Sequence, residues 1–208
     1  MPKTLIICAH PRPRHSVVTS DLRQTLQAAA AQTASPVEVR DLYALYPDFD
    51  IDVIAEQQAL SEADLVIWLC PVYWYSVPAL LKHWFDKVLT YGWAYGEQAH
   101  ALRGKSLWWV TSAGAESAAY REQAAHGLGF EAFVAPIEHV ARYCGMRWLP
   151  YFVVHAGQQA PESQRSDTRE ALARQFQAHL AQIELQAPAS GEPAEQVAAI
   201  TRTAREAS

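Results

Sequence analysis

The chain has 208 residues, of which 50% are hydrophobic and 19% are charged, a composition typical of one globular domain. Its net charge of −5 and the lack of a Lys/Arg cluster argue against a nucleic-acid-binding protein. No apolar run approaches the roughly 18 residues of a membrane-spanning helix, and the opening MPKTLIICAHP is too short in apolar residues for a signal peptide. We therefore expect a soluble cytoplasmic protein in which Cys8, Cys70 and Cys144 are buried free thiols.

The first third of the chain alternates predicted strands with predicted helices. Residues 4–9, TLIICA, form an apolar run without alternation, as in a strand buried on both faces of a parallel sheet. Ser16 is a candidate N-cap for a helix that extends to about Ala34. A more exposed strand at 37–42 and a helix near 53–62 follow.

The same alternation continues to the end of the predicted domain. In chain order we expect a central strand at 64–70, a helix at 78–90, a strand at 105–111, a helix at about 131–143, a final strand at 148–155 and a closing surface helix at 165–184.

Strands that alternate with helices predict a doubly wound α/β fold. Five short strands favour the flavodoxin-like fold, a five-stranded parallel sheet with helices on both faces, over the longer dinucleotide-binding fold. We assign residues 1–186 to this domain. The small and polar residues 187–208, which include Pro and Gly, are expected to form a poorly ordered tail or a short helix.

Ligands of open parallel sheets bind outside the carboxyl ends of the strands, where the strand order reverses. Three loops of this chain reach that place, at residues 10–16, 71–76 and 111–117. A binding site of this protein is therefore expected to be built from these three loops.

The first loop can bind a phosphate. It leads into a helix N-terminus, where free backbone N–H groups and the helix dipole attract anions. The side chains of His10, Arg12, Arg14, His15 and Ser16 add donors. The alternative is that the two arginines are solvated loop charges and that His10 serves only the fold. The loop lacks the G-x-x-x-x-G-K-[ST] pattern, which argues against nucleoside triphosphate hydrolysis.

The second loop contains three consecutive aromatic residues, Tyr73, Trp74 and Tyr75, directly after the strand that Pro71 ends. Successive side chains of a strand point to opposite faces, so all three cannot serve one core. They can form a wall for a flat aromatic ligand. Packing on the next helix or at a subunit interface explains them equally well.

The third loop, TSAGAES, is small and can bring backbone donors close to a ligand, although a generic strand-to-helix turn looks similar. The segment GLGFEA at 127–132 matches G-x-G-x-x-A but follows no predicted strand, so we reject it as a dinucleotide fingerprint. The histidines show no metal-ligand spacing, and no metal is expected. Together the three loops favour a flavin, which is flat, polar along one edge and linked to a phosphate.

Several segments in order resemble the flavodoxin-like NAD(P)H:quinone oxidoreductases, the family of DT-diaphorase. They are ICAHPRPRHS, CPVYWYSVPALLKHWFDKV, GWAYG, LRGKSLWWVTSAGAES and YCGMRWLP. The segment LYALYPDFDIDVIAEQQALSEADLVIW is especially similar to the ancillary flavoproteins of glutathione-gated potassium-efflux systems. The resemblance extends over about residues 4–184.

The resemblance implies a cofactor site in three parts. They are a phosphate and ribityl part at His10, Ser16, Val17, Val18 and Thr19, an isoalloxazine loop at Pro71, Val72, Tyr73, Trp74 and Tyr75, and a pyrimidine-edge loop at Thr111, Ser112, Ala113 and Gly114.

Three further residues match family positions beside the flavin. Tyr120 and His126 correspond to the tyrosine and histidine proposed to assist hydride transfer in DT-diaphorase, although a surface helix pair is an equally good explanation. Tyr95 corresponds to an aromatic residue that closes the substrate pocket, often across the dimer. The chain departs from the family at Thr19, where asparagine is common, and in SAGA, where TGGG is usual.

By this resemblance we expect an enzyme that uses FMN, with FAD as the alternative, to pass two electrons from NAD(P)H to a quinone, and a homodimer. The second hypothesis is a flavin-binding regulatory subunit of a potassium-efflux antiporter, held at the inner membrane through that partner. A flavodoxin-like electron carrier is disfavoured, because such carriers are usually more acidic and lack a nicotinamide pocket.

Overall fold

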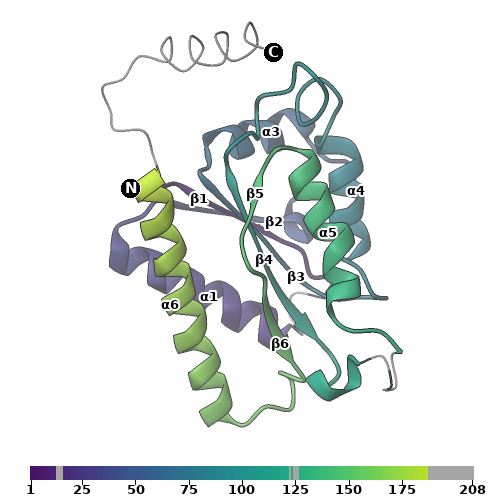
Figure 1. Ribbon diagram of the computed structural model, residues 1–208, viewed down its shortest axis with the longest axis vertical. Helices are drawn as coiled ribbons and strands as arrows, with labels where there is room; N and C mark the ends of the chain where they lie inside the picture. Colours follow the sequence, from purple (N-terminus) through teal and green to yellow (C-terminus); the bar gives the residue numbers. More distant parts are fainter. Residues whose placement is uncertain (13–15, 122, 124–126, 187–208) are drawn as a thin grey trace, which may run out of the picture.

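The computed structural model describes residues 1–12, 16–121, 123 and 127–186 (Figure 1). The elements in chain order are β1 (Thr4–Cys8), α1 (Val17–Thr33), β2 (Val37–Asp41), α2 (Leu42–Leu45), α3 (Val53–Glu62), β3 (Leu65–Pro71), α4 (Ala79–Val88), β4 (Ser106–Ala113), a 3₁₀ turn (Ser117–Ala119), α5 (Glu131–Tyr143), β5 (Arg147–Trp148), β6 (Phe152–His155) and α6 (Glu162–Gln186). The tail that we expected at residues 187–208 lies outside the described residues.

All pairings between these strands are parallel, in the order β2-β1-β3-β4-β5, with β6 also on β4. This order confirms the predicted flavodoxin-like sheet. In register, Cys8 of β1 lies beside Asp41 of β2 and Leu69 of β3. The carboxyl ends of the strands therefore meet at one edge, which is the lower end of the sheet in Figure 1, where β4 and β6 end.

The prediction of one continuous strand at 148–155 is wrong. The segment forms two strands, β5 and β6, which pair with the two ends of β4. Pro150 lies in the gap and has no N–H to donate to a strand ladder. The Pro150 carbonyl instead accepts a hydrogen bond from the Trp108 indole N–H at 2.9 Å. The two short strands thus occupy the place of the predicted fifth strand.

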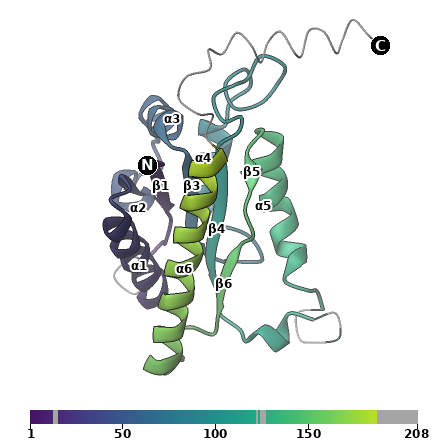
Figure 2. The same ribbon diagram turned by 60° about the vertical axis from the view of Figure 1, so that its left-hand side comes forward.

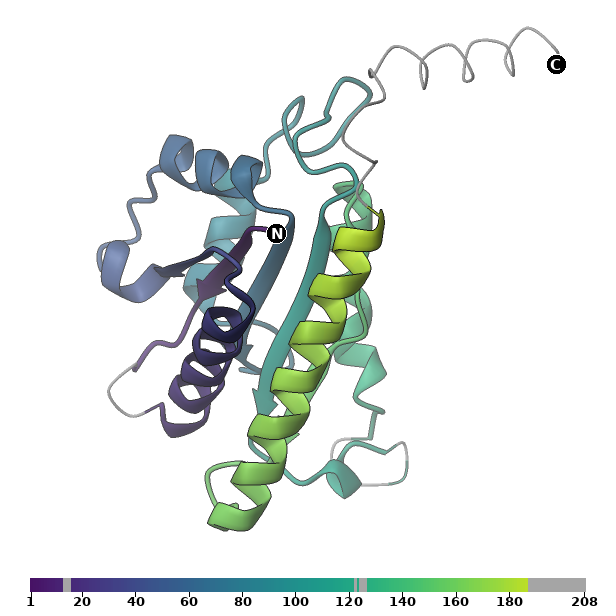
Figure 3. The same cartoon turned by 90° about the vertical axis from the view of Figure 1, so that its left-hand side faces the viewer.

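Helices cover both faces of the sheet, as expected (Figures 2 and 3). One face packs on α3, α4 and α5 through a cluster that includes Trp68, Trp84 and Trp109. The other face packs on α1 and α6, which lie side by side, through a cluster that includes Trp108 and Phe176. These aromatic side chains are almost completely buried. Each buries about 150–250 Å² of surface, and their removal from water is a main source of stability.

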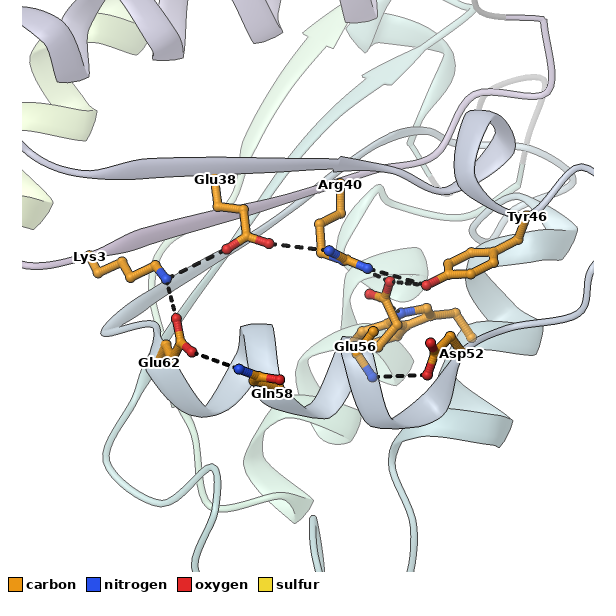
Figure 4. A network of polar contacts seen from close by, with 10 residues as sticks. Lys3, Glu38, Arg40, Tyr46, Asp52, Glu56, Gln58 and Glu62 are labelled. Atoms are coloured by element: carbon orange, nitrogen blue, oxygen red, sulfur yellow. Dashed lines mark hydrogen bonds and ion pairs between the residues drawn. The ribbon is translucent and has the colours of Figure 1, made fainter.

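A buried carboxylate joins β2, α3 and α4 (Figure 4). Glu56 is fully buried, and its Oε1 accepts hydrogen bonds from Arg40 Nε at 2.7 Å and from the Tyr46 hydroxyl at 2.6 Å. Its Oε2 accepts from the Trp84 indole N–H at 2.8 Å. Burial and the bond to Glu56 raise the pKa of Tyr46 to about 12. Both carboxylate oxygens therefore have partners, as the burial of a charge requires.

The three cysteines are buried and free, as predicted. Within residues 1–12, 16–121, 123 and 127–186, no helix combines the length and apolar character needed to cross a bilayer. The fold thus directs attention to the carboxyl edge of the sheet, where the predicted ligand loops meet.

Candidate functional site

A cavity of about 140 Å³ lies at the carboxyl edge of the sheet. It is lined by most of the residues that the sequence placed in a cofactor site, from all three predicted loops, and by a fourth loop. The lining residues are His10, Ser16, Val17, Val18, Thr19, Pro71, Val72, Tyr73, Ser112, Ala113, Gly114, Ala156, Gly157 and Gln158. Three predicted cofactor residues, Trp74, Tyr75 and Thr111, are outside this lining.

The N-terminus of α1 opens into this cavity through Ser16. Ser16 occupies the N-cap position of α1, as predicted, but its side chain makes no capping hydrogen bond. The residue is buried, and its Oγ has no hydrogen-bond partner among the described residues. The first-turn N–H groups of α1 also lack partners within the helix. A phosphate bound here would satisfy both kinds of donor, so the cavity fits such a group.

His10 is 8% exposed and lies between the first two loops. Its Nδ1 accepts a hydrogen bond from the Arg12 backbone N–H at 3.0 Å, and its Nε2 lies 3.4 Å from the Tyr73 hydroxyl. Burial lowers the pKa of His10. The ring is therefore neutral at pH 7 and carries its proton on Nε2, on the side of Tyr73. Two candidate phosphate ligands of this loop, Arg14 and His15, lie outside the described residues.

The aromatic triplet forms a tight turn. Tyr73 and Ser76 exchange two backbone hydrogen bonds of 2.9 and 3.1 Å around Trp74 and Tyr75. Both central residues have positive φ, 49° and 63°, as in the type I′ turns that favour Asn-Gly. Such a backbone costs roughly 1–2 kcal/mol per non-glycine residue. Trp74 is 93% exposed at the tip, whereas the Tyr75 ring packs on Phe133.

The third loop divides between the cavity and the core. Ser112, Ala113 and Gly114 line the cavity. Thr111 is fully buried, and its hydroxyl donates to the Cys70 carbonyl at 2.7 Å, which joins β4 to β3. In this structure Thr111 therefore supports the sheet beneath the cavity.

The fourth loop, which sequence reasoning missed, follows β6. Ala156 has a positive φ of 49°, and its N–H donates to the Ala113 carbonyl at 2.9 Å. A Cβ on Gly157 would lie 2.8 Å from Val154 and 3.1 Å from Val18, so only glycine lets the loop approach α1 this closely. The sequence feature that could have predicted this loop is HAGQQA, which directly follows a strand that ends at the same edge as the other three loops.

Tyr120 lies after the 3₁₀ turn, beside the start of α5. Its ring centroid is 5.3 Å from that of Phe130, 6.0 Å from that of Phe133 and 5.2 Å from that of His155. Its predicted partner His126 lies outside the described residues. The roles of both residues in hydride transfer stay predictions.

Tyr95 lines a different cavity, of about 440 Å³, between α4 and α5. Its ring centroid is 5.3 Å from that of Tyr143, and Phe85 and Leu89 of the α4 region lie on the same cavity. Within one chain this places Tyr95 away from the cavity at the carboxyl edge. A role in closing the substrate pocket would then need a second copy of the chain.

The chemistry of the carboxyl-edge cavity suits a neutral polar ring linked to a phosphate. The described lining contains hydroxyl, imidazole and backbone donors, and it contains no Asp, Glu, Lys or Arg. A cluster of side chains able to hold a metal ion is absent from the described part of the chain. The site can therefore position a flat organic cofactor, and the reactive chemistry would come from that cofactor.

Comparison with known proteins agrees with this reading. The family model for the flavodoxin-like fold matches residues 2–180. The chain is 50% identical over 152 residues to the glutathione-regulated potassium-efflux system ancillary protein KefF of Enterobacter sp. (strain 638), over 73% of this chain and 82% of that protein. It is 53% identical to KefF of Klebsiella aerogenes, over 73% and 81% of the two chains.

Two solved structures are also similar. General stress protein 14 of Treponema denticola, in complex with FMN, has 38% identity and a TM-score of 0.72, over 88% of this chain and 99% of that chain. An NADPH-quinone reductase of P. pentosaceus has 32% identity and a TM-score of 0.71, over 84% and 97%. The resemblance drawn from the sequence is confirmed: this chain belongs to the flavodoxin-like family that includes the KefF ancillary proteins.

Proposed function

We propose that this protein is an FMN-dependent NAD(P)H:quinone oxidoreductase. The observation that carries the proposal is the carboxyl-edge cavity, which is lined by the α1 N-terminus and by Ser16, whose buried hydroxyl has no partner in the part of the chain that the structure describes. Structural relatives include an FMN complex and an NADPH-quinone reductase. FMN is preferred to FAD, because the chain lacks the long insertions that would cover an adenosine.

The residues divide the binding work between them. His10 and residues 16–19 would hold the phosphate and the ribityl chain. Val72 and Tyr73 line the cavity, and the exposed turn that follows them at Trp74 and Tyr75 would close along the ring. Gly157 lets the fourth loop pack on α1 and close the cavity on that side. Bound FMN would supply the hydride-accepting and electron-donating chemistry.

The loop after β4 would act on the charge that develops on the pyrimidine edge of a reduced flavin. Residues 112–114 line the cavity, and Gly114, which follows the end of β4, would offer its backbone N–H. One preorganised donor aimed at developing negative charge is typically worth about 3 kcal/mol. Tyr120 and His126 would assist at the same edge.

The KefF relatives support a second function, that of an ancillary subunit of a potassium-efflux system. In this role the protein would bind a membrane antiporter and lie at the inner membrane through that partner. The two functions are compatible, because one flavoprotein can both turn over quinones and regulate a partner.

We also propose a homodimer that forms through α4 and α5. Tyr91 and Tyr143 are 75% and 64% exposed near the cavity that Tyr95 lines, and soluble surfaces rarely gather aromatic rings without a partner. Sedimentation of the wild type and of Tyr143→Glu tests this. A dimer that the variant weakens is expected, and a wild-type monomer at micromolar concentration would contradict it.

The function is tested with purified protein and either FMN or FAD. We expect tight FMN binding by fluorescence quenching, weaker FAD binding, and steady turnover with NADH or NADPH and a soluble benzoquinone. Absence of binding to both flavins would overturn the cofactor assignment. Binding without turnover would remove the enzyme and leave the regulatory subunit, for which specific co-purification with a membrane antiporter is the positive result.

A further inference from the structure

The loop between β6 and α6, residues 156–160, forms one wall of the carboxyl-edge cavity. Ala156, Gly157 and Gln158 line the cavity. In Figure 1 the loop runs from the lower end of β6 to the start of α6, which begins at Glu162. The proposed function places this loop beside the flavin, so the position of the loop determines how closely the site fits the cofactor.

The backbone of this loop is tied to the sheet at its start. The Ala156 N–H donates to the Ala113 carbonyl of β4 at 2.9 Å. The N–H groups of Gln159 and Ala160 donate at 3.0 and 3.4 Å to the carbonyls of Ala156 and Gly157, which belong to the loop itself. Among the described residues, the far half of the loop thus has no backbone hydrogen bond to a neighbouring element.

Arg165 of α6 supplies hydrogen bonds to that far half. Its Nε donates to the Ala160 carbonyl at 3.1 Å, and its Nη2 donates to the Gln158 carbonyl at 3.3 Å. The guanidinium group is planar and rigid, so two bonds from one group fix the separation and the direction of the two carbonyls. One side chain therefore joins the loop to α6.

The Arg165 side chain lies where the loop meets α1. It is half-buried and lines a small cavity together with Val18 of α1 and Gly157. Gly157 approaches Val18 so closely that an added Cβ would lie 3.1 Å from Val18 Cγ2. Arg165 therefore holds the loop at the point where its contact with α1 leaves no room for a side chain.

The position of Arg165 is unfavourable for the helix that carries it. It is the fourth residue of α6, and a positive charge near a helix N-terminus opposes the helix dipole. Among the described residues Arg165 forms no ion pair, and Glu162 of the same turn pairs with Arg169. What an arginine gains at this position is the pair of hydrogen bonds to the loop.

We propose that Arg165 is a positioning residue that holds residues 156–160 against α1 and thereby closes this side of the carboxyl-edge cavity. The importance of the closure for flavin binding rests on the proposed function. Arg165 does not line the cavity, so it would act through Gly157 and Gln158 and would not itself touch the cofactor. The rival explanation is that its charge attracts the cofactor phosphate from a distance.

Three variants separate these explanations. Arg165→Ala removes both hydrogen bonds, whereas Arg165→Lys keeps the charge and one donor group but lacks the fork. Arg169→Ala is the matched control, because it removes the same charge one turn later on α6. Arg169 pairs with Asp21 of α1 at 3.3 Å, and in the described part of the chain it neither lines the cavity nor bonds to the loop.

The first readout is amide hydrogen exchange of the flavin-free protein, followed by NMR at Gln159 and Ala160, whose N–H groups are bonded within the loop. We expect faster exchange in Arg165→Ala, partial recovery in Arg165→Lys and wild-type exchange in Arg169→Ala. Unchanged exchange in Arg165→Ala would overturn the inference, and so would an Arg165→Lys variant that recovers nothing.

The second readout is the Kd for FMN at two salt concentrations. Arg165→Ala should weaken FMN binding by about tenfold, as expected for lost hydrogen bonds from a charged group, and Arg169→Ala should keep the wild-type Kd. The ratio of the Arg165→Ala and wild-type Kd values should be the same at about 50 and about 500 mM KCl, because salt screens the attraction of a distant phosphate but not a local hydrogen bond. A difference that disappears at high salt would overturn the positioning role in favour of the rival explanation.

The outcomes separate this inference from the proposed function. If the wild type binds neither FMN nor FAD but Arg165→Ala speeds exchange in the loop, the proposed function fails and the positioning role stands. If the wild type binds FMN, equal affinity of Arg165→Ala would overturn the inference and leave the proposed function standing. Failure of both Arg165 variants to fold would also overturn it, because Arg165 would then serve the fold alone.

Discussion

Two buried polar regions of this molecule differ in how completely their hydrogen bonds are formed. Around Glu56, three donors from β2, α4 and the segment after α2 satisfy both oxygens of one carboxylate. At the carboxyl edge, Ser16 Oγ, Asp41 Oδ1 and His155 Nδ1 are buried without partners among the described residues. The Glu56 cluster is thus saturated, whereas Ser16 Oγ at the cavity is left free for a ligand. Lack of a partner is not confined to this edge, because Thr4 Oγ1, Trp68 Nε1 and His179 Nε2, which do not line the cavity, are also buried without partners among the described residues.

Positive φ at non-glycine residues is more frequent at the carboxyl edge, which holds three of the five cases among the described residues, the other two being Ala34 and Phe49. Trp74, Tyr75 and Ala156 adopt positive φ at the carboxyl edge, where no glycine relieves them. Local strain of this kind persists only where surrounding structure enforces it, and it concentrates at functional sites. The Glu56 cluster therefore stabilises the protein, whereas the strained turns at the carboxyl edge lower the stability of the flavin-free protein and are explained by ligand binding.

The largest effect is expected from breaking the saturated region. Glu56→Leu leaves the Arg40 guanidinium and the Trp84 N–H without their acceptor, and loss of one partner from a buried ion pair costs about 3–5 kcal/mol. Urea unfolding should show this loss, with unchanged FMN affinity of the folded fraction. Glu62→Gln, which breaks an exposed ion pair with Lys3, is the surface control and should lower the free energy of unfolding far less, because solvent screens such a pair. An unaltered midpoint in Glu56→Leu would contradict the structural role.

A matched pair of serines compares the two regions directly. Ser16 and Ser35 are both buried, but Ser35 Oγ donates to the Pro2 carbonyl and Ser16 Oγ has no partner. Ser35→Ala should lower the free energy of unfolding by about 1 kcal/mol and leave FMN binding unchanged. Ser16→Ala should not destabilise the flavin-free protein but should weaken FMN binding by about tenfold, as expected for a lost bond to a charged group. The reverse pattern would show that Ser16 serves the fold.

Relieving the strained turn should have a smaller effect, which raises the stability of the protein but lowers its affinity for flavin. Trp74→Gly relieves a left-handed conformation at an exposed position and should stabilise the flavin-free protein by about 0.5–1 kcal/mol. The same change, like Trp74→Ala, should weaken flavin binding because the ring is lost. Thermal unfolding and FMN titration measure the two quantities. Equal stabilities of Trp74→Gly and Trp74→Ala would show that the turn is not strained.

The smallest effect is a pH dependence of stability. Burial lowers the pKa of His10, His155 and His179 below the ordinary 6.5. Near and below pH 6.5 these three histidines therefore bind more protons in the unfolded chain than in the native protein. The free energy of unfolding should fall as the pH drops through and below 6.5. Unfolding curves between pH 7.5 and 5 test this. His179→Leu should flatten the slope, and an unchanged slope would exclude a contribution from His179.

The sequence predicted the fold well where local pattern and tertiary context agree. The helix expected at 131–143 is α5, with the same bounds. The residues of its apolar face are also the ones that packing on the sheet buries, so the local pattern and the fold agree. The break at Pro150 was missed because apolar residues on both sides of it continue the strand pattern. The sequence alone did not indicate the Glu56 cluster, since its donors come from three separate segments.

The candidate site was predicted in its loops and less well in its details. The rule about carboxyl ends found three of the four loops that line the cavity, and it applies equally to the missed loop after β6. The turn at Trp74 and Tyr75 could not be recognised, because aromatic residues are rare at positive φ. The hidden position of Thr111 depends on which strand face the sheet register buries.

The interruption at Pro150 has a consequence for how this protein behaves at high concentration. The strands β5 and β6 form one margin of the sheet, where unpaired backbone groups could recruit strands from another molecule. This margin is divided into strands of two and four residues with a proline between them, so another chain finds no continuous strand to pair with. The same feature that hid the strand boundary thus protects the protein against sheet-to-sheet aggregation.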